Sequence, residues 1–182
     1  MKRSQWRASL SGAVPNAALA SWLQEPASLT ARCQRQCGDF RVRLLGYGKG
    51  RPLAADGLPL DGGRQLAWVR EVGLECDGVP VIFAHTTLST ASHGRLSRWL
   101  SRLGSRSLGS LLFTHPGFRR GTIEFCRLDS HHPLFQRAAI LGETGKYLWA
   151  RRSLHRLGSQ QVLVTEVFLP AILGLGSGRS AR

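Results

Sequence analysis

The stretch LAWVREVGLECDGVPVIFAHTT, residues 66–87, places two strand-like runs on either side of the dipeptide Asp77-Gly78. Both central positions of a tight two-residue hairpin turn need a positive φ, and an Asp-Gly pair is compatible with that conformation. Apolar and polar residues alternate along the first run, as they do in a strand with one buried face. The sequence therefore predicts one long antiparallel hairpin over residues 66–87.

Arg70 is out of place in the first of these runs. In a strand, alternation sends it to the same face as a set of apolar side chains. A buried guanidinium that is not paired and hydrogen-bonded costs on the order of several kcal/mol. We therefore expect an anionic group to meet Arg70. The apolar residues on its face are Leu66, Trp68, Val72, Leu74 and Cys76.

Glu166 presents the same anomaly with the opposite sign in the last strand-like run, QVLVTEVFLP, residues 161–170. It shares a face with Val162, Val164 and Phe168. Two interpretations stay open at this point. Arg70 and Glu166 pair with each other across the sheet, or they form a polar pair at one end of an apolar cavity. In the second case Arg70 binds a ligand carboxylate and Glu166 a ligand hydroxyl or proton.

The remaining elements indicate the fold class. Asn16 and Ser28 are suited to cap two early helices, and runs of strand-like and helix-like residues then follow without the βαβ alternation of a parallel sheet. We predict a single α+β domain with a largely antiparallel sheet of about six strands and helices packed on it. Helices are expected at 17–25, 29–37, 96–103 and 132–141, and strands at 40–48, 66–76, 79–87, 122–128, 146–157 and 161–170.

Length and composition are consistent with one folded domain. The chain has 182 residues, of which 42% are hydrophobic, enough for a proper core without disulfides or a metal. We expect the folded domain over residues 16–173, a flexible N-terminus over 1–15 and a disordered tail over 174–182. A monomer is the expected state.

The net charge of +14 does not by itself identify a partner. Almost all of the cations are arginines, a bias that coding composition also produces. No zinc-finger spacing, aromatic RNA-binding signature or long basic run accompanies the charge, so specific nucleic-acid binding is not favoured. Attraction of small anions is the better interpretation.

Cysteine spacing and the N-terminal sequence exclude several other classes. The four cysteines at positions 33, 37, 76 and 126 form no paired CxxC units, and we interpret them as reduced thiols rather than zinc ligands. The N-terminus lacks the apolar stretch of a signal peptide, and no segment is long enough to span a bilayer. We therefore expect a cytoplasmic protein with no transmembrane segment and no metal.

The motif WARRS, residues 149–153, adds a second basic position. On a strand Arg151 and Arg152 face opposite sides, so only one of them can point toward a site. The histidines fall into no catalytic or metal-binding pattern, and we expect them on the surface or in loops. They are His85, His93, His115, His131, His132 and His155.

Four motifs occur in the order and spacing of the chorismate lyase family, which this chain resembles from about Trp22 to Pro170. The most specific is the last one, and the others gain weight from their order. The motifs are WVREV (68–72), LGSRSLGSLLFT (103–114), WARRS (149–153) and LVTEVFLP (163–170).

This resemblance implies an enzyme that converts chorismate to 4-hydroxybenzoate and pyruvate without a cofactor, the first step of ubiquinone biosynthesis in bacteria. Position by position, the family's carboxylate-binding arginine falls on Arg70. The carboxylate near the product hydroxyl falls on Glu166. Chorismate carries two carboxylates, so cationic residues in an otherwise apolar cavity suit it.

The same resemblance implies further contacts to substrate or product. Two ligand contacts fall on Leu29 and Leu108, the latter through its backbone, and the segments around both correspond to flaps over the ligand. The basic pair falls on Arg151 and Arg152, one of which we expect to stabilise the leaving enolpyruvate.

Two departures from the family pattern concern the second strand and a later insertion. His85 and Ser89 stand where relatives tend to have an arginine and a proline, which places the edge of that strand in question. The segment at 129–147 is longer than in the shortest relatives, and we interpret it as a surface elaboration.

Two other classes of function remain as alternatives. The same fold type serves as the effector-binding domain of transcription regulators, where an arginine and a carboxylate hold a small ligand without turnover. Such regulators normally carry a DNA-binding domain upstream, and only about 15 residues precede the first expected helix here. A nucleic-acid-binding module is the third interpretation, and a steep salt dependence of binding would distinguish it.

Overall fold

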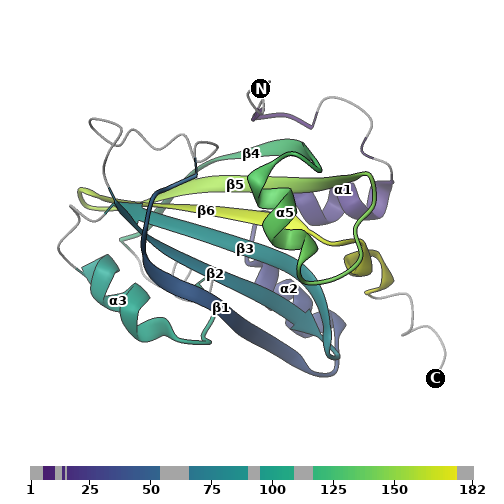
Figure 1. The fold of residues 1–182 in the computed structure, drawn as a ribbon, viewed down its shortest axis with the longest axis horizontal. Coiled ribbons are helices and arrows are strands. Elements are labelled where there is room, and N and C mark those ends of the chain that lie inside the picture. The colour runs from purple at the N-terminus through teal and green to yellow at the C-terminus, as the bar shows by residue number, and fades with distance from the viewer. Residues whose placement is uncertain are drawn as a thin grey trace.

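In the computed structural model, the described part of the chain forms one sheet of six antiparallel strands in the order β1-β2-β3-β6-β5-β4 (Figure 1). Residues 6–10, 14, 16–53, 66–89, 95–108 and 117–175 are described. The prediction of an α+β fold with about six antiparallel strands is confirmed. The strands are β1 (Phe40–Gly50), β2 (Ala67–Cys76), β3 (Val79–Ser89), β4 (Arg119–Asp129), β5 (Tyr147–Leu157) and β6 (Gln160–Phe168).

The hairpin of β2 and β3 follows the turn chemistry of its sequence. Asp77 and Gly78 both adopt positive φ values, 51° and 78°, as the two-residue turn requires. The Asp77 carboxylate also accepts hydrogen bonds from the backbone N–H groups of Gly38 (2.9 Å) and Asp39 (2.7 Å). The tip of the hairpin is thereby attached to the segment that leads into β1.

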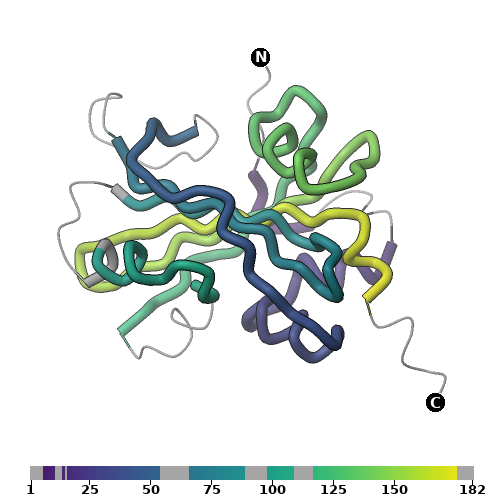
Figure 2. The backbone as a smooth tube through the Cα atoms, turned by 60° about the horizontal axis from the view of Figure 1, so that its bottom comes forward, coloured from purple at the N-terminus to yellow at the C-terminus, as the bar shows by residue number. Residues whose placement is uncertain are grey.

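Helices cover both faces of the sheet (Figure 2). Helices α1 (Ala17–Leu23), α2 (Leu29–Gln36) and α3 (Arg95–Leu103) lie on one face, and α5 (Pro133–Ala139) lies on the other. The predicted caps of the first two helices are confirmed, because the side chains of Asn16 and Ser28 accept hydrogen bonds from first-turn N–H groups of α1 and α2.

Three clusters of buried side chains form the core. One lies beneath α1 and α2 and includes Trp22, Leu23 and Leu74, and another lies beneath α3 and includes Leu100 and Val162. Both lie on the same face of the sheet, because the strand residues in the two clusters occupy the alternate positions whose side chains point to that face. The functional site described below lies between these two clusters.

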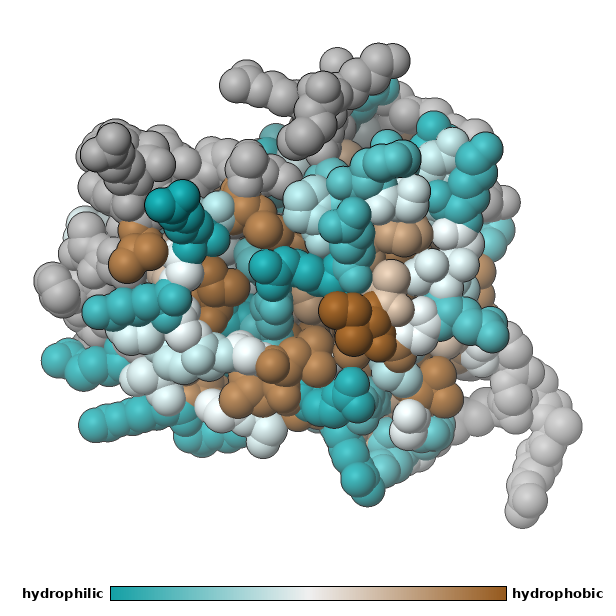
Figure 3. All heavy atoms as spheres, viewed as in Figure 1, coloured by the Kyte–Doolittle hydropathy of each residue, from teal (hydrophilic) through white to brown (hydrophobic). Residues whose placement is uncertain are grey.

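The third cluster corrects our interpretation of residues 129–147. We expected a surface elaboration there, but Leu134 and Phe135 of α5 are buried in one cluster with Phe83 and Val167 of the sheet. The segment therefore covers the second face of the sheet and forms part of the core. Figure 3 shows this side of the molecule, where the apolar groups are separated by hydrophilic side chains.

The ends of the chain are only partly described. Arg7 forms two backbone hydrogen bonds with Phe125 of β4, of 3.0 and 2.8 Å, so part of the expected flexible segment 1–15 pairs with the edge of the sheet. The rest of that segment contains residues 1–5, 11–13 and 15, which lie outside the described residues, as do residues 176–182 of the expected tail. Gly174 ends a 3-10 helix, η2 (Pro170–Gly174), that the sequence did not predict. No helix of the described residues has the length and apolar character needed to cross a membrane.

Asp77→Ala is expected to lower the free energy of unfolding by about 2 kcal/mol. It removes two hydrogen bonds to a charged acceptor. Alanine also lacks the polar side chain that, in aspartate, offsets the cost of a positive φ by hydrogen-bonding locally. Asp77→Asn is the matched control. It keeps an oxygen acceptor and tolerates the left-handed conformation, so it should lose about 1 kcal/mol or less. Urea unfolding followed by circular dichroism measures both, and equal losses would contradict the role given to the carboxylate.

Candidate active site

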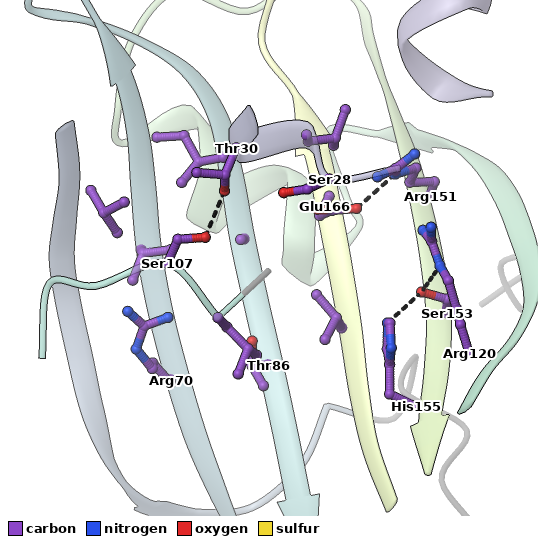
Figure 4. A pocket seen from close by; sticks show the side chains of 17 residues that line it. Ser28, Thr30, Arg70, Thr86, Ser107, Arg120, Arg151, Ser153, His155 and Glu166 are labelled. Atoms are coloured by element: carbon purple, nitrogen blue, oxygen red, sulfur yellow. Dashed lines mark hydrogen bonds and ion pairs between the residues drawn. The ribbon is translucent and has the colours of Figure 1, made fainter. Parts of the chain in front are cut away.

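A pocket lies on the face of the sheet that carries α1, α2 and α3, between the start of α2 and the loop that follows α3 (Figure 4). It encloses about 560 Å³ of empty space, including the part open to solvent. The lining combines aliphatic with charged and hydroxyl side chains, namely Ser28, Leu29, Thr30, Val42, Arg70, Val72, Leu74, Ala84, Thr86, Ser107, Leu108, Arg120, Arg151, Ser153, His155, Val164 and Glu166.

The antiparallel register brings the charged and polar residues of the pocket floor together. Residues directly opposite one another on neighbouring strands point to the same face, so each row of partners across the sheet contributes to the floor. One register therefore fixes the relative positions of all these groups. From β2 to β4, the three rows are Trp68, Leu88, Val162, His155 and Arg120; Arg70, Thr86, Val164, Ser153 and Ile123; and Val72, Ala84, Glu166, Arg151 and Phe125.

Arg70 forms one side of the pocket and is only 3% exposed. Its Nη2 donates to the carbonyl oxygens of Gly104 (2.9 Å) and Arg106 (2.8 Å), in the loop after α3. Its buried Nε makes no hydrogen bond to the described residues. Burial lowers the pKa of the guanidinium to about 10, so it stays charged at neutral pH. Within the described chain, Arg70 thus has neutral partners only, and its charge is available to a bound anion.

Glu166 forms its ion pair with Arg151, which stands directly opposite it on β5. Arg151 Nε donates to Glu166 Oε2 at 2.6 Å, and the side chains are 2% and 17% exposed. The Nη1 of Arg151 donates to the carbonyl oxygens of Leu23 (3.3 Å) and Glu25 (2.6 Å). The pair therefore links the sheet to the segment that joins α1 and α2, and it fixes the direction of the Glu166 carboxylate.

The first interpretation of the two charged residues, a direct pair between Arg70 and Glu166, is wrong. Strand β3 separates β2 from β6, with Thr86 opposite Arg70 and Ala84 opposite Glu166. Adjacent strands lie about 4.8 Å apart. The backbone positions of Arg70 and Glu166 are therefore separated by two strand spacings, and the two residues belong to neighbouring rows of partners rather than to the same row. Both line the pocket instead.

Of the two arginines of WARRS, the structure places Arg151 in the pocket and Arg152 on the opposite face. Arg152 Nε donates to Glu124 Oε2 at 2.7 Å, and its guanidinium lies over the ring of Trp6 at 4.4 Å. The reason is the alternation of the strand, which sends consecutive residues to opposite sides. The expectation that Arg152 contacts the ligand therefore has no support in its position.

Leu29 and Leu108 both line the pocket from segments that cover the sheet. Leu29 opens α2, and Leu108 follows the loop after α3, at a helical position. The two segments meet directly, because the hydroxyl groups of Thr30 and Ser107 lie 2.7 Å apart in a hydrogen bond (Figure 4). The two flap segments expected from the resemblance thus come together over one cavity.

Seven polar residues of the pocket were not assigned to a site from the sequence, namely Ser28, Thr30, Thr86, Ser107, Arg120, Ser153 and His155. The last three form one hydrogen-bonded cluster. Arg120 Nε donates to Ser153 Oγ at 3.2 Å, and Ser153 Oγ lies 3.0 Å from His155 Nε2. Alternation along β5 places Ser153 and His155 on the face of Arg151, a signal that the sequence contained. Arg120 joins them only through the pairing of β4 with β5, which the sequence did not indicate.

The histidines differ from the expectation that they lie on the surface or in loops. His85, His132 and His155 are buried, and His132 caps α5 by accepting a hydrogen bond from Leu134 N at 3.1 Å. Burial lowers the pKa of His155 to about 4, and the charge of Arg120 adds to the effect. His155 is therefore neutral at physiological pH. His131 is exposed as expected, whereas His93 and His115 lie outside the described residues.

Metal ligands and reactive thiols do not gather in the described residues. No group of three or more His, Cys, Asp or Glu side chains in this part of the chain could hold a metal ion. All four cysteines are buried free thiols. Burial raises the pKa of Cys33 to about 12 and that of Cys126 to about 11, so neither is a ready nucleophile.

The chain is an α+β domain with a pocket on one face of its sheet, and solved structures share this fold. The effector domain of PhnF from Mycobacterium smegmatis covers 79% of this chain and 89% of its own, with a TM-score of 0.51 and 19% identity. A GntR-family transcriptional regulator from Bacillus cereus covers 73% and 93%, with a TM-score of 0.50 and 13% identity. At these identities the likeness extends to the fold alone.

Sequence comparison gives a closer relationship, and the chain belongs to the chorismate lyase family, whose model matches residues 1–174. A protein of Dechloromonas aromatica, "Probable chorismate pyruvate-lyase", is 69% identical over 172 residues, which are 94% of this chain and 98% of that protein. A protein of Ralstonia nicotianae with the same name is 44% identical over an alignment of 184 positions, which covers 93% of this chain and 91% of that protein.

Arg151→Met is expected to lower the free energy of unfolding by about 3 kcal/mol or more, because it leaves Glu166 in the pocket without its countercharge and two carbonyl oxygens without their donor. Arg152→Met is the matched control. Its ion pair with Glu124 is more exposed, at 15% and 37%, so its loss should be about 1 kcal/mol. Urea unfolding of both variants tests the difference, which disappears if the two arginines are equivalent.

A second prediction concerns pH. The pKa of His155 is about 4 in the folded chain and about 6.5 in an unfolded one, so the unfolded state binds an additional proton between these values. Unfolding free energy should therefore fall as the pH is lowered from 7 to 4, by about 3 kcal/mol from this residue. His155→Gln should remove that part of the pH dependence, and His131→Gln, at an exposed position, should not. Parallel pH profiles for wild type and His155→Gln would refute the assignment.

Proposed function

We propose that this protein is a chorismate pyruvate-lyase in which Arg70 and Glu166 act on the two ends of the substrate ring. The observation that supports this most is their placement. Both line one pocket, Arg70 lacks a carboxylate partner in the described chain, and Glu166 is oriented by Arg151. The family to which the chain belongs acts on chorismate.

In this proposal Arg70 binds the carboxylate on the ring, because a buried guanidinium gains most from an anion that can form charge-assisted hydrogen bonds with it. Glu166 binds the 4-hydroxyl group or takes part in proton transfer near it. Aliphatic side chains such as Val72 and Val164 line the pocket and suit the faces of the ring.

The reaction itself balances without an external oxidant or reductant. The ether bond at ring carbon 3 breaks, the hydrogen at carbon 4 leaves as a proton, and the ring becomes aromatic. The released enolpyruvate takes up one proton at its methylene carbon and becomes pyruvate. The protein has to hold the reactive conformer and to stabilise negative charge on the leaving enolpyruvate.

Leu29 and Leu108 are proposed to contact the ligand from the two segments that cover the pocket, Leu108 through its backbone. The two segments are linked by the Thr30–Ser107 hydrogen bond. Opening of this link would give the ring access to the pocket, and its formation would exclude water from the cavity.

We further propose that the protein works without a cofactor, as a monomer in the cytoplasm, and that its product enters ubiquinone biosynthesis. The resemblance to the family supports each of these points. The high net charge of +14 is then a surface property rather than a sign of specific nucleic-acid binding.

The test is to incubate purified protein with chorismate, without added metal or cofactor, and to measure 4-hydroxybenzoate by absorbance and pyruvate by a coupled assay. Equimolar formation of both products is expected. Arg70→Gln and Glu166→Gln should each lower kcat/KM at least 100-fold, since each removes a charged contact in a buried site. Arg152→Gln, on the opposite face of the sheet, should keep at least half of the activity.

Other outcomes would redirect the proposal. Loss of activity in a folded Arg152→Gln variant would mean that the pocket is not the active site. No turnover by the wild type, together with saturable binding of 4-hydroxybenzoate, would favour a ligand-sensing domain of the kind that shares this fold. Binding of DNA or RNA with a steep salt dependence would favour the third class.

A further inference from the structure

The segment between Asp77 and Glu124 is strongly basic. Its 46 residues, 78–123, contain six arginines and no aspartate or glutamate. Elsewhere in the described chain arginines often pair with a carboxylate, as Arg152 does with Glu124. Charges of one sign repel one another in a compact protein, so the fold does not need this bias. The positive charges of the segment therefore point to a use outside the folded core.

Helix α3 and the loop after it carry three of these arginines on the surface. Arg98, Arg102 and Arg106 are exposed and spaced four residues apart. Within the described residues none of the three forms an ion pair. Leu100 and Leu103, on the apolar side of the helix, are buried against the sheet. Like charges at i and i+4 of a helix cost stability, so the fold gains nothing from placing Arg102 after Arg98.

The start of β4 continues the basic surface. The ring of Phe118, just ahead of β4, lies 6.2 Å from that of Trp99 on α3, so this end of the strand is beside the helix. The next residue, Arg119, is exposed and stands directly opposite the exposed Arg156 of β5. Like charges in such a pair are also unfavourable. In Figure 3 hydrophilic side chains project at the end of the molecule where Figure 1 places α3.

The opposite end of the sheet differs in that its exposed arginines have countercharges. Arg41 pairs with Asp39 at 2.9 Å and Arg43 with Glu75 at 3.3 Å. Both pairs lie where β1 begins, whereas α3 follows the far end of β3, at Ser89. The described chain thus presents ion-paired arginines at one end of the sheet and the unpaired arginines of α3 at the other.

We propose that Arg98, Arg102 and Arg106, the basic face, dock the protein onto a bilayer that contains anionic phospholipids. A guanidinium binds phosphate oxygens through two parallel hydrogen bonds. Each basic residue close to an anionic bilayer strengthens binding about fivefold. Three such residues on one side of α3 and its loop are therefore sufficient for a specific orientation on the bilayer.

A bilayer suits the basic face better than a nucleic acid does. Trp99 follows Arg98 in α3 and is partly exposed, and its ring packs beside Phe118. Arginine and tryptophan are both favoured at the boundary between lipid and water. Proteins that bind single-stranded nucleic acids present aromatic rings on which bases stack, and the sequence carries no nucleic-acid recognition motif.

Docking brings the cover of the pocket to the bilayer. The carbonyl oxygens of Gly104 and Arg106 accept hydrogen bonds from Arg70 in the pocket floor, and Leu108, which follows this loop, lines the pocket. The loop that carries Arg106 thus also forms part of the roof. A ligand that leaves beneath it is released next to the bilayer. This holds for any ligand of the pocket, so the inference does not rest on the lyase function.

The test is sedimentation of the full chain with lipid vesicles. Wild type should bind vesicles of phosphatidylglycerol and phosphatidylcholine and should not bind phosphatidylcholine alone. A triple variant with Arg98→Gln, Arg102→Gln and Arg106→Gln should lose about 100-fold in the partition coefficient, the product of three fivefold factors. Added salt should weaken the binding of the wild type more than that of the variant.

The matched control carries Arg41→Gln, Arg43→Gln and Arg127→Gln, which remove three exposed arginines toward the opposite end of the sheet. The change in net charge is the same. Strand β3 has 11 residues and is about 35 Å long, so charges at its other end lie beyond the screening length of about 10 Å at 0.1 M salt. The control should therefore bind within about threefold of the wild type.

A further variant keeps the result independent of folding defects. Arg98→Lys, Arg102→Lys and Arg106→Lys together retain the positive charge and should recover most of the binding. Circular dichroism melting shows that each variant is folded. Equal losses in the two glutamine variants would mean that binding follows net charge alone, and the basic face would be wrong. Absence of wild-type binding to anionic vesicles, or tighter binding of duplex DNA or RNA through the same arginines, would overturn the proposal.

Discussion

The buried ion pair between Arg151 and Glu166 is the interaction on which the arrangement of the pocket depends. Neither charge is stable in an apolar interior without the other, and the register of β5 and β6 places them directly opposite each other. Arg151 then uses its Nη1 to hold the carbonyl oxygens of Leu23 and Glu25. A single guanidinium thus fixes the carboxylate in the floor and also the segment that leads into α2, which forms part of the roof.

The other two arginines of the pocket bind the roof in the same way. Arg70 donates to the carbonyl oxygens of Gly104 and Arg106 in the loop after α3, and Arg120 donates to that of Pro26. Carbonyl oxygens satisfy hydrogen-bond donors but leave the net charge of a guanidinium in place. The covering segments are therefore held down by side chains of the pocket floor, and Arg70 keeps a charge that an anionic substrate can meet.

Local signals predicted the elements, while tertiary pairing decided the site. Asp77-Gly78 fixed the hairpin, and Asn16 and Ser28 fixed the starts of two helices, because turns and caps depend on neighbouring residues. Arg70 and Glu166 were recognisable as charges on apolar faces. Their relation was not, since the order of strands in a sheet depends on long-range packing. Arg120 was missed for the same reason, as it reaches the pocket only through the pairing of β4 with β5.

The contrast between Arg151 and Arg152 shows how one strand serves two environments. Alternation sends the first to the pocket and the second to the other face, where Glu124 and Trp6 surround it. That face also carries its own polar contacts, with Glu71 in a hydrogen bond with His85 (2.9 Å) and in an ion pair with Arg137 of α5 (2.7 Å). Charges on that side are used to attach α5 and the N-terminal segment to the sheet. On the pocket side Arg151 pairs with Glu166, whereas Arg70 has only carbonyl partners within the described chain, so the two faces of the sheet use the same residue types differently.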